Sequence, residues 1–286
     1  MTPKNYIRTL LRAIAMVAAI FIATSAAAQT AVPQQTMEEV FREIKTSHKY
    51  GLVITAPEGK MTDSPSIFRK GDTWYMYYII FDGRGYETWM ATSQNLLDWT
   101  TQGRVMSFTA DTDWDSNQKA GYLSLVDTKW GGSYKIKRYA DRYWMSYLGG
   151  SSRGYESGTL AVGIAYNKDE PTKVKEWERL EKPVLSPKDE DADWWDNSVI
   201  YKSSVIEDKK RLTGHRFVMY YNAKGNAERI GMAASDDMVS WKRLGSDPIL
   251  DHHRGITGDA YLQRMGKLRV MFYFGFGWDK EQSGKA

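Results

Sequence analysis

The chain of 286 residues contains no cysteine, and its 39 basic and 35 acidic residues nearly balance. Without cysteine there are no disulfides, so an exported form of this chain relies on its core alone. Residues 1–28 hold three of the basic residues and no acidic residue, which leaves the remaining chain close to neutral. This balance excludes the basic footprint of a nucleic-acid-binding protein.

Residues 1–28 have the layout of a secretory signal peptide. Lys4, Arg8 and Arg12 precede an apolar run at residues 13–24, and small residues at 25–28 offer a cleavage site before Gln29. The alternative is an uncleaved membrane anchor. No other stretch of the sequence is apolar enough to span a membrane. We therefore expect a periplasmic or secreted protein whose mature form has no membrane association.

Residues 29–49 are expected to form a helical lead-in to the main domain. Apolar residues recur at helical spacing within residues 36–48, which predicts one amphipathic helix there. Residues 50–286 then form a single repeat-built domain.

The main domain contains a repeated pattern of strands. Four short aromatic runs, at residues 74–78, 143–147, 217–221 and 270–273, are typical of β-strands. Residues 90–99 and 232–241 repeat a strand, a Ser-Asn/Asp turn and a tryptophan, and residues 162–177 form a looser copy. Four antiparallel strands per unit, recurring every 50–75 residues or roughly so, indicate the blades of a β-propeller. A stacked β-sandwich is the alternative, but it would not repeat the same strand order.

The fourth unit stops early, because no third or fourth strand follows residues 276–278. The sequence therefore predicts an all-β fold with about three and a half blades, incomplete at the C-terminus.

Residues 63–68 read Asp-x-Pro-x-Ile-Phe and lead into the first aromatic strand. This motif resembles the first blade of the five-bladed β-propeller glycoside hydrolases, which include families 32, 43, 68, 117 and 130. The resemblance covers roughly residues 50–278 and does not choose a family within the superfamily. It implies a five-bladed propeller whose site lies on the propeller axis, with carboxylates near the starts of the innermost strands.

The resemblance also implies roles for three aspartates. Asp63 matches the general base or nucleophile, and Asp196 resembles the aspartate that orients the sugar. Asp259 stands near the place where family 43 carries its general-acid glutamate, so the acid differs from that family's pattern. In the second unit, alignment of the aromatic strands puts Gly132 at the position of Asp63. Glycosidic cleavage needs a protonated group and an ionised carboxylate on opposite sides of the bond.

A second set of candidates follows from the geometry of an antiparallel blade. The turns after the aromatic strands share a rim with Asp63, and each carries an Arg and a Glu that we expect to contact substrate. Bracing of neighbouring blades is the alternative for Glu87 and Glu156, whereas Glu228 is a candidate acid. Trp194 and Trp195 are expected as a sugar platform, with core packing as their alternative. The turn residues are Arg84, Glu87, Arg153, Glu156, Glu228 and Arg229.

We expect no cofactor. Asp111, Asp113 and Asp115 have the spacing of a calcium loop but lack the glycine and distal glutamate of an EF-hand, which leaves calcium as the one alternative. The expected function is hydrolysis of O-glycosyl bonds in plant or algal oligosaccharides. A glycoside phosphorylase, with Arg84, Arg153 and Arg229 around phosphate, is one alternative. A non-catalytic carbohydrate-binding propeller is the other.

Overall fold

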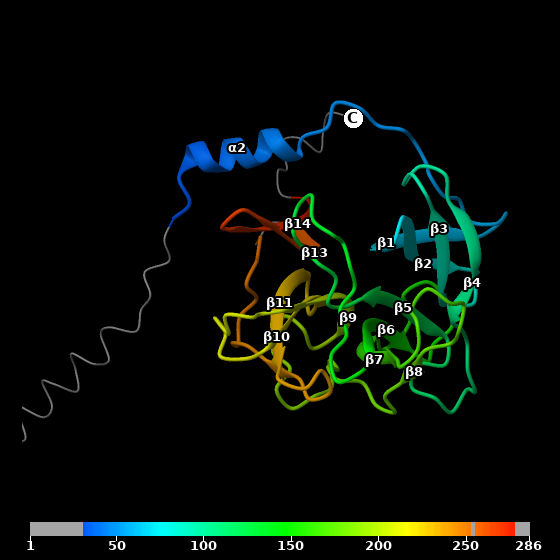
Figure 1. Ribbon diagram of the computed structural model, residues 1–286. Helices are drawn as coiled ribbons and strands as arrows, with labels where there is room; N and C mark the ends of the chain where they lie inside the picture. Colours follow the sequence, from blue (N-terminus) through cyan, green and yellow to red (C-terminus); the bar gives the residue numbers. More distant parts are fainter. Residues whose placement is uncertain (1–30, 253–254, 278–286) are drawn as a thin grey trace, which may run out of the picture. The chain divides into compact units, whose positions relative to one another are not determined.

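The computed structural model describes residues 31–252 and 255–277 (Figure 1). The chain divides into two compact units, one ending at Lys49 and the other beginning at Tyr50. The predicted signal peptide lies outside the described residues. Among the residues that are described, no helix is long and apolar enough to cross a membrane.

The first unit contains the helix α2 (Gln34–Ile44). It confirms the predicted helix, although it begins and ends earlier than residues 36–48. Pro33 precedes it with a φ of −57°, the value that proline fixes and that a helix start needs. The helix ends where Lys45 takes an extended conformation, and none of its residues is buried.

The second unit consists of strands that repeat one antiparallel order (Figure 1). Three repeats each hold four strands, and the fourth holds a hairpin. This confirms the nearly all-β architecture and the repeated strand order. The repeats comprise β1 (Met61–Lys70), β2 (Thr73–Phe81), β3 (Tyr86–Ser93) and β4 (Thr100–Met106); β5 (Gln118–Leu123), β6 (Tyr143–Gly150), β7 (Ala161–Asn167) and β8 (Glu178–Arg179); β9 (Val199–Glu207), β10 (Phe217–Lys224), β11 (Glu228–Ser235) and β12 (Lys242–Arg243); and β13 (Ile256–Met265) with β14 (Leu268–Phe276).

The turns from β3 to β4 and from β11 to β12 are built in the same way. Ser93 and Ser235 each accept hydrogen bonds from the backbone N–H groups two and three residues later. Trp99 and Trp241 each donate from the indole to the carbonyl three residues earlier, at 2.9 and 3.1 Å. Because these contacts are local, the repeated sequence forms the same turn twice.

The second repeat begins with β5, so the placement of Gly132 at the position of Asp63 was wrong. Asp63 pairs with Ile79 in β2, and the matching residue of β6, Leu148, pairs with Ala120. Ala120 therefore stands where the first repeat has its aspartate. The alignment failed because residues 124–142 form a long excursion between β5 and β6.

The hydrophobic core lies between neighbouring repeats. Tyr77 and Met90 of the first repeat share one buried cluster with Met145 and Trp177 of the second. A second cluster joins the second and third repeats in the same manner, through residues such as Trp144 and Phe217. Burying such a side chain stabilises the fold by about 1.5–3 kcal/mol. The sheets thus pack face to face, which leaves strand ends and loops at one rim available to line a cavity.

Candidate active site

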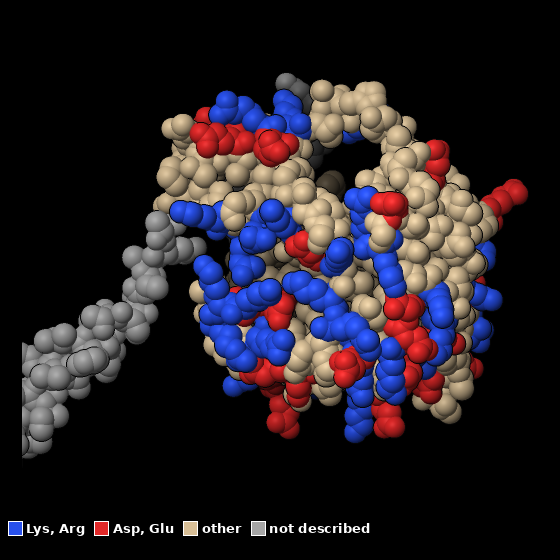
Figure 2. Space-filling view, viewed as in Figure 1, with Lys and Arg blue, Asp and Glu red and all other residues tan. Residues whose placement is uncertain are grey.

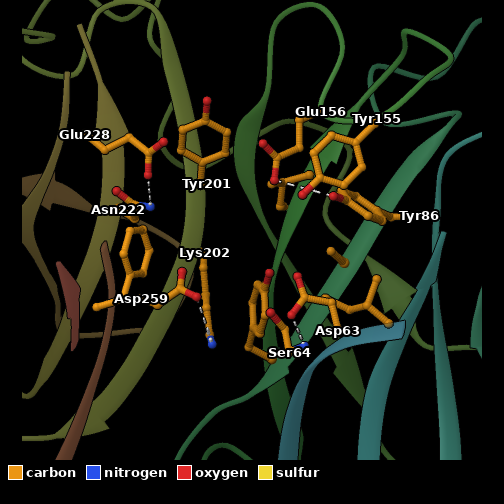
Figure 3. Close-up of a pocket in the computed structure, with 15 residues that line it drawn as sticks. Asp63, Ser64, Tyr86, Tyr155, Glu156, Tyr201, Lys202, Asn222, Glu228 and Asp259 are labelled. Atoms are coloured by element: carbon orange, nitrogen blue, oxygen red, sulfur yellow. Dashed lines mark hydrogen bonds and ion pairs between the residues drawn. The ribbon is translucent and has the colours of Figure 1, made fainter. Parts of the chain in front are cut away.

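One cavity of about 250 Å³ is lined by residues of all four repeats (Figure 3). Each repeat contributes one carboxylate, namely Asp63, Glu156, Glu228 and Asp259. The other lining residues are mostly aromatic or small, and the one basic side chain among them is Lys202. They are Ser64, Ile79, Tyr86, Ala120, Tyr122, Leu148, Tyr155, Tyr201, Lys202, Asn222 and Phe274.

Topology explains why residues so distant in the sequence meet. Asp63 and Asp259 lie near the starts of β1 and β13, and Glu228 is the first residue of β11. Glu156 lies in the loop between β6 and β7. In an antiparallel unit the start of the first strand, the end of the second and the start of the third share one rim. The structure thus brings together four of the residues that the sequence singled out.

Glu156 lies on the wall formed by the second repeat, next to two tyrosines (Figure 3). The hydroxyl of Tyr86 donates to Glu156 Oε1 at 3.4 Å. Burial raises the pKa of Glu156, and the charge of Glu228 raises it further. The φ of 45° at Glu156 is unusual for a residue other than glycine and turns the chain sharply beside the cavity.

Glu228 lies on the opposite wall and is held by an amide (Figure 3). Asn222, near the end of β10, donates from Nδ2 to Glu228 Oε2 at 3.2 Å. Gly258 makes room for this amide, because a Cβ there would stand 2.5 Å from Asn222 Nδ2. The hydrogen bond from a neutral amide fixes the position of the carboxylate and leaves its other oxygen directed at the cavity's contents.

Asp259 and Asp63 form the remaining acidic part of the lining. Lys202 Nζ lies 3.7 Å from Asp259 Oδ2. Burial raises the pKa of Asp259, the charge of Lys202 counteracts this, and the charge of Asp63 adds to it. Asp63 Oδ1 accepts a hydrogen bond from the backbone N–H of Ser64 at 2.6 Å.

The cavity therefore has an excess of negative charge. Four carboxylates face one lysine, and like charges that share a site disfavour simultaneous ionisation. The site can hold a proton on one carboxylate while another stays ionised, and these are the two states that acid–base chemistry requires.

The structure does not bring Asp196 to the cavity, so the expectation that it orients a sugar directly is corrected. Its side chain is fully buried. Asp196 Oδ2 accepts from Arg243 Nε at 2.7 Å and from the Tyr221 hydroxyl at 2.9 Å. It lies before β9 in a turn, where Asp196 Oδ1 also accepts from the backbone N–H of Asp193. This is a buried ion pair within the third repeat.

The two tryptophans before Asp196 differ in exposure. Trp195 is 2 % exposed, stacks on Tyr221 and donates its indole N–H to the carbonyl of Ser246. Its role is core packing, so the prediction of a sugar platform was wrong for this residue. Trp194 is 44 % exposed and lies under the guanidinium of Arg229, but it does not line the cavity.

The remaining turn residues face away from the cavity's interior. Glu87 is 1 % exposed and accepts from Arg104 and Ser107, so bracing explains it better than substrate contact. Arg84 packs over Phe108 and donates to Asn117 at 2.6 Å.

Two arginines complete this comparison. Arg229 is buried and lies 2.6 Å from Asp251, and the exposed Arg153 lies 4.0 Å from Asp111. The structure therefore places none of Arg84, Arg153 and Arg229 in the lining of the cavity.

The Asp-x-Asp-x-Asp segment is engaged by cations of the protein itself. Arg179 contacts Asp113 and Asp115, and the buried Lys119 lies 3.8 Å from Asp115. Within residues 31–252 and 255–277 no group of three or more metal-binding side chains could hold a metal ion.

Several cavity residues escaped sequence reasoning. Tyr86 and Tyr155 precede Glu87 and Glu156 in the same Arg-Gly-Tyr-Glu turn, so the repeat itself was the available signal. Tyr201, Lys202 and Asn222 had no such signal. β9 carries a bulge opposite Asn222, between the pairs Tyr221–Ser203 and Ala223–Ile200, and this bulge turns Tyr201 and Lys202 toward the cavity.

The protein matches no known family model and no curated protein sequence. Among solved structures, a complex of BT0996 with RGII is 46 % identical, with a TM-score of 0.83, over 86 % of this protein and 74 % of that one. A structure described as "Glycoside hydrolase" is 44 % identical with the same TM-score and the same coverage.

A more distant structure shares the fold alone. It is Zg3597, a family 117 glycoside hydrolase of the marine bacterium Zobellia galactanivorans, which is 17 % identical, with a TM-score of 0.54, over 79 % of this protein and 69 % of that one. Identity of 44–46 % over most of both sequences is decisive for the first two structures. This protein belongs with them to the glycoside hydrolases of the β-propeller superfamily, and it is a glycoside hydrolase acting on O-glycosyl bonds.

Proposed function

We propose that this enzyme hydrolyses plant or algal oligosaccharides with Glu156 as general acid and Glu228 as the ionised carboxylate. One observation carries the proposal: four carboxylates from four repeats line a single cavity, and the pKa of Glu156 is raised there by burial and by Glu228. A glycosidase needs such a pair of carboxyl groups with separated proton affinities.

Glu156 is suited to the acid role. Its raised pKa keeps the proton on the carboxyl group closer to neutral pH than an exposed glutamate would. In the reaction this proton passes to the glycosidic oxygen as the bond from that oxygen to the anomeric carbon breaks. The leaving sugar departs as a neutral alcohol.

Glu228 is suited to the ionised role, because it faces Glu156 from the opposite wall and is positioned by Asn222 (Figure 3). It either accepts a proton from the attacking water or bonds to the anomeric carbon itself, and water then releases the sugar. The resemblance implies this role for Asp63. We assign it to Glu228 because its charge is the one that raises the pKa of Glu156 most.

Asp63 and Asp259 are then free to bind sugar hydroxyl groups. Asp259 is paired with Lys202, so the two offer an acceptor and a donor side by side. The hydroxyls of Tyr122 and Tyr201 add further polar atoms to the lining, and burial raises the pKa of Tyr201 to about 12, which keeps it a donor.

Hydrolysis fits this cavity better than phosphorolysis. A phosphorylase must bind a dianion beside the sugar, and the arginines considered for that role do not line the cavity. Four carboxylates would repel phosphate, and Lys202 already faces Asp259.

The substrate proposal draws on the most informative neighbour. The 46 % identical structure is a complex with RGII, so an oligosaccharide derived from RGII is the first substrate to test. The signal-peptide layout of residues 1–28 supports a periplasmic or secreted enzyme, which is where such oligosaccharides are encountered.

The acid role is tested with Glu156→Gln and two substrates. One is an RGII oligosaccharide, and the other is the 2,4-dinitrophenyl glycoside of whichever sugar the native enzyme releases from it. A missing acid should slow the oligosaccharide by roughly 10²–10⁴-fold. The dinitrophenyl glycoside should react almost normally, because its leaving group needs no proton. Equal losses on both substrates would remove Glu156 from the acid role.

Glu228→Gln should lose activity on both substrates, and added azide should restore turnover by replacing the missing carboxylate. Asp63→Asn is the matched control, since it removes the other candidate charge from the same cavity. Azide rescue of Asp63→Asn instead of Glu228→Gln would return the ionised role to Asp63.

A further inference from the structure

A second concave surface lies away from the catalytic cavity, and we call it the basic groove. It measures about 670 Å³ and is formed by the loop between β5 and β6, the loop after β9 and the hairpin of β13 and β14. Six basic side chains line it: Lys135, Lys137, Lys209, Lys210, Arg264 and Arg269. Figure 2 shows Lys and Arg side chains gathered over the part of the molecule where Figure 1 labels β9.

The two acidic residues of the groove are already engaged. Glu207 lies 3.7 Å from Lys137 and 3.2 Å from Arg216. Asp127 Oδ2 accepts from the backbone N–H and the hydroxyl of Ser133, which holds the loop, and its pKa is lowered.

Of the basic side chains, Lys137 and Arg269 have acidic partners, Glu207 and Asp208. The other four lie within 4.0 Å of no carboxylate of the described residues. They are Lys135, Lys209, Lys210 and Arg264, all exposed. The groove therefore carries a net positive charge that the protein does not balance.

The groove lies at the other end of the strands that build the catalytic cavity. β13 runs from Asp259 in the cavity to Arg264 in the groove, and β9 runs from Lys202 to Glu207. Five residues of strand span roughly 17 Å. The two sites are thus separate and of opposite charge, but the same two strands position both.

An exposed tryptophan lies beside the groove. Trp130 is 37 % exposed, and its ring lies nearly parallel to that of Phe272, with centroids 6.2 Å apart. Its backbone N–H donates to the carbonyl of Arg264 at 3.0 Å, which ties it to the edge of the groove. A rigid, half-exposed aromatic ring provides an apolar face next to the cations.

We propose that the basic groove binds an acidic stretch of polysaccharide through its carboxylate groups, with Trp130 against a sugar ring. Lys209, Lys210 and Arg264 supply the charge, and Arg264 can hold a carboxylate with two parallel hydrogen bonds. The acidic catalytic cavity would repel such a stretch, so the groove offers the complementary place. Binding there would keep the enzyme on an acidic polymer while the cavity acts elsewhere on it.

Binding of polygalacturonate to the full-length enzyme, measured by affinity electrophoresis and calorimetry, tests the proposal. Neutral dextran should not bind. Raising NaCl to about 1 M shortens the Debye length to about 3 Å and should abolish binding. The double variant Lys209→Gln/Lys210→Gln should weaken binding roughly tenfold, and Trp130→Ala should weaken it without changing the salt dependence.

The matched control is Lys182→Gln/Lys188→Gln, which removes the same charge from exposed positions outside the groove. It should bind polygalacturonate like the native enzyme, and all variants should hydrolyse a small glycoside normally. Equal weakening in both double variants would reduce the effect to net charge and overturn the proposal. Duplex DNA binding as tightly as polygalacturonate, or binding of dextran, would overturn it as well.

Discussion

Ser64 in β1 and Asp259 in β13 occupy the same position of a shared β-bulge, and both have a positive φ, of 47° and 58°. In each strand the register shifts by one residue at this position, between Asp63 and Ser66 and between Gly258 and Tyr261. Two inner strands thus carry the same local kink where they reach the cavity. Bulges of this kind redirect side chains at sites of function.

The bulge predicts different outcomes for two substitutions of Asp259. Asparagine tolerates a left-handed conformation, whereas a β-branched residue does not. Asp259→Val should therefore lower the free energy of unfolding by about 1–2 kcal/mol, while Asp259→Asn should leave it nearly unchanged. Urea denaturation compares the two. Equal stability of both variants would show that the strained backbone relaxes or costs little.

The raised pKa of Glu156 predicts a pH-dependent stability cost. A carboxyl group with a raised folded pKa holds its proton more tightly in the folded protein, so its stabilisation is present at low pH. That stabilisation is lost as pH rises from about 4.5, the ordinary pKa of a glutamate, through the folded pKa. Glu156→Gln should remove the loss and be more stable than the native enzyme at pH 7, by about 1 kcal/mol.

Thermal unfolding of the two proteins across this pH range checks the prediction. The difference between their stabilities should grow as pH rises and vanish at low pH. Glu181→Gln, at an exposed position away from the cavity, should show no such trend. A native enzyme more stable than Glu156→Gln at pH 7 would mean that the carboxylate is stabilised, not strained, by its surroundings.

The repeat was predictable because its signals are local. The Ser-Asn/Asp turn and the following tryptophan, seen at Ser93 and Ser235, fix the same hydrogen bonds wherever they occur. β5 was not predictable, since Gln118–Leu123 is buried throughout, contains one aromatic residue and is separated from β6 by a long excursion. Register across such an excursion depends on tertiary packing.

The site was predictable in part, and the two Arg-Gly-Tyr-Glu turns show why. Tyr86 and Glu87 are the first two residues of β3, so their side chains point to opposite faces, and with Tyr86 in the cavity Glu87 must face away. Tyr155 and Glu156 lie in a loop instead, where the positive φ of Glu156 lets both line the cavity. The same four letters therefore place different carboxylates.

The buried pair of Asp196 and Arg243 predicts a structural role that can be separated from catalysis. Asp196→Ala leaves a buried guanidinium without its nearest partner and should cost about 3–5 kcal/mol of stability. Asp189→Ala removes a half-exposed partner of the same arginine and should cost less than about 1 kcal/mol. Urea unfolding distinguishes them. A stable but inactive Asp196→Ala enzyme would point back to a direct role in sugar binding.

Tyr155 predicts a contribution to substrate binding at the edge of the cavity. It is 56 % exposed, although Phe81 and Tyr86 hold its ring in edge-to-face contact at 5.6 and 5.9 Å between centroids. A ring that is fixed yet open on one side has little entropy left to lose when a sugar packs on it. Tyr155→Ala should raise KM for an oligosaccharide by roughly threefold to tenfold, corresponding to the ~0.5–1.5 kcal/mol of an aromatic contact.

Tyr155→Phe is the matched control, because it keeps the ring and removes the hydroxyl. It should retain the native KM if the ring face makes the contact, and kcat should change little in either variant, since Glu156 keeps its hydrogen bond from Tyr86. Steady-state kinetics on the same oligosaccharide gives both constants. If Tyr155→Phe raised KM as much as Tyr155→Ala, the hydroxyl would be the binding group; if Tyr155→Ala lowered kcat alone, the ring would act by positioning Glu156.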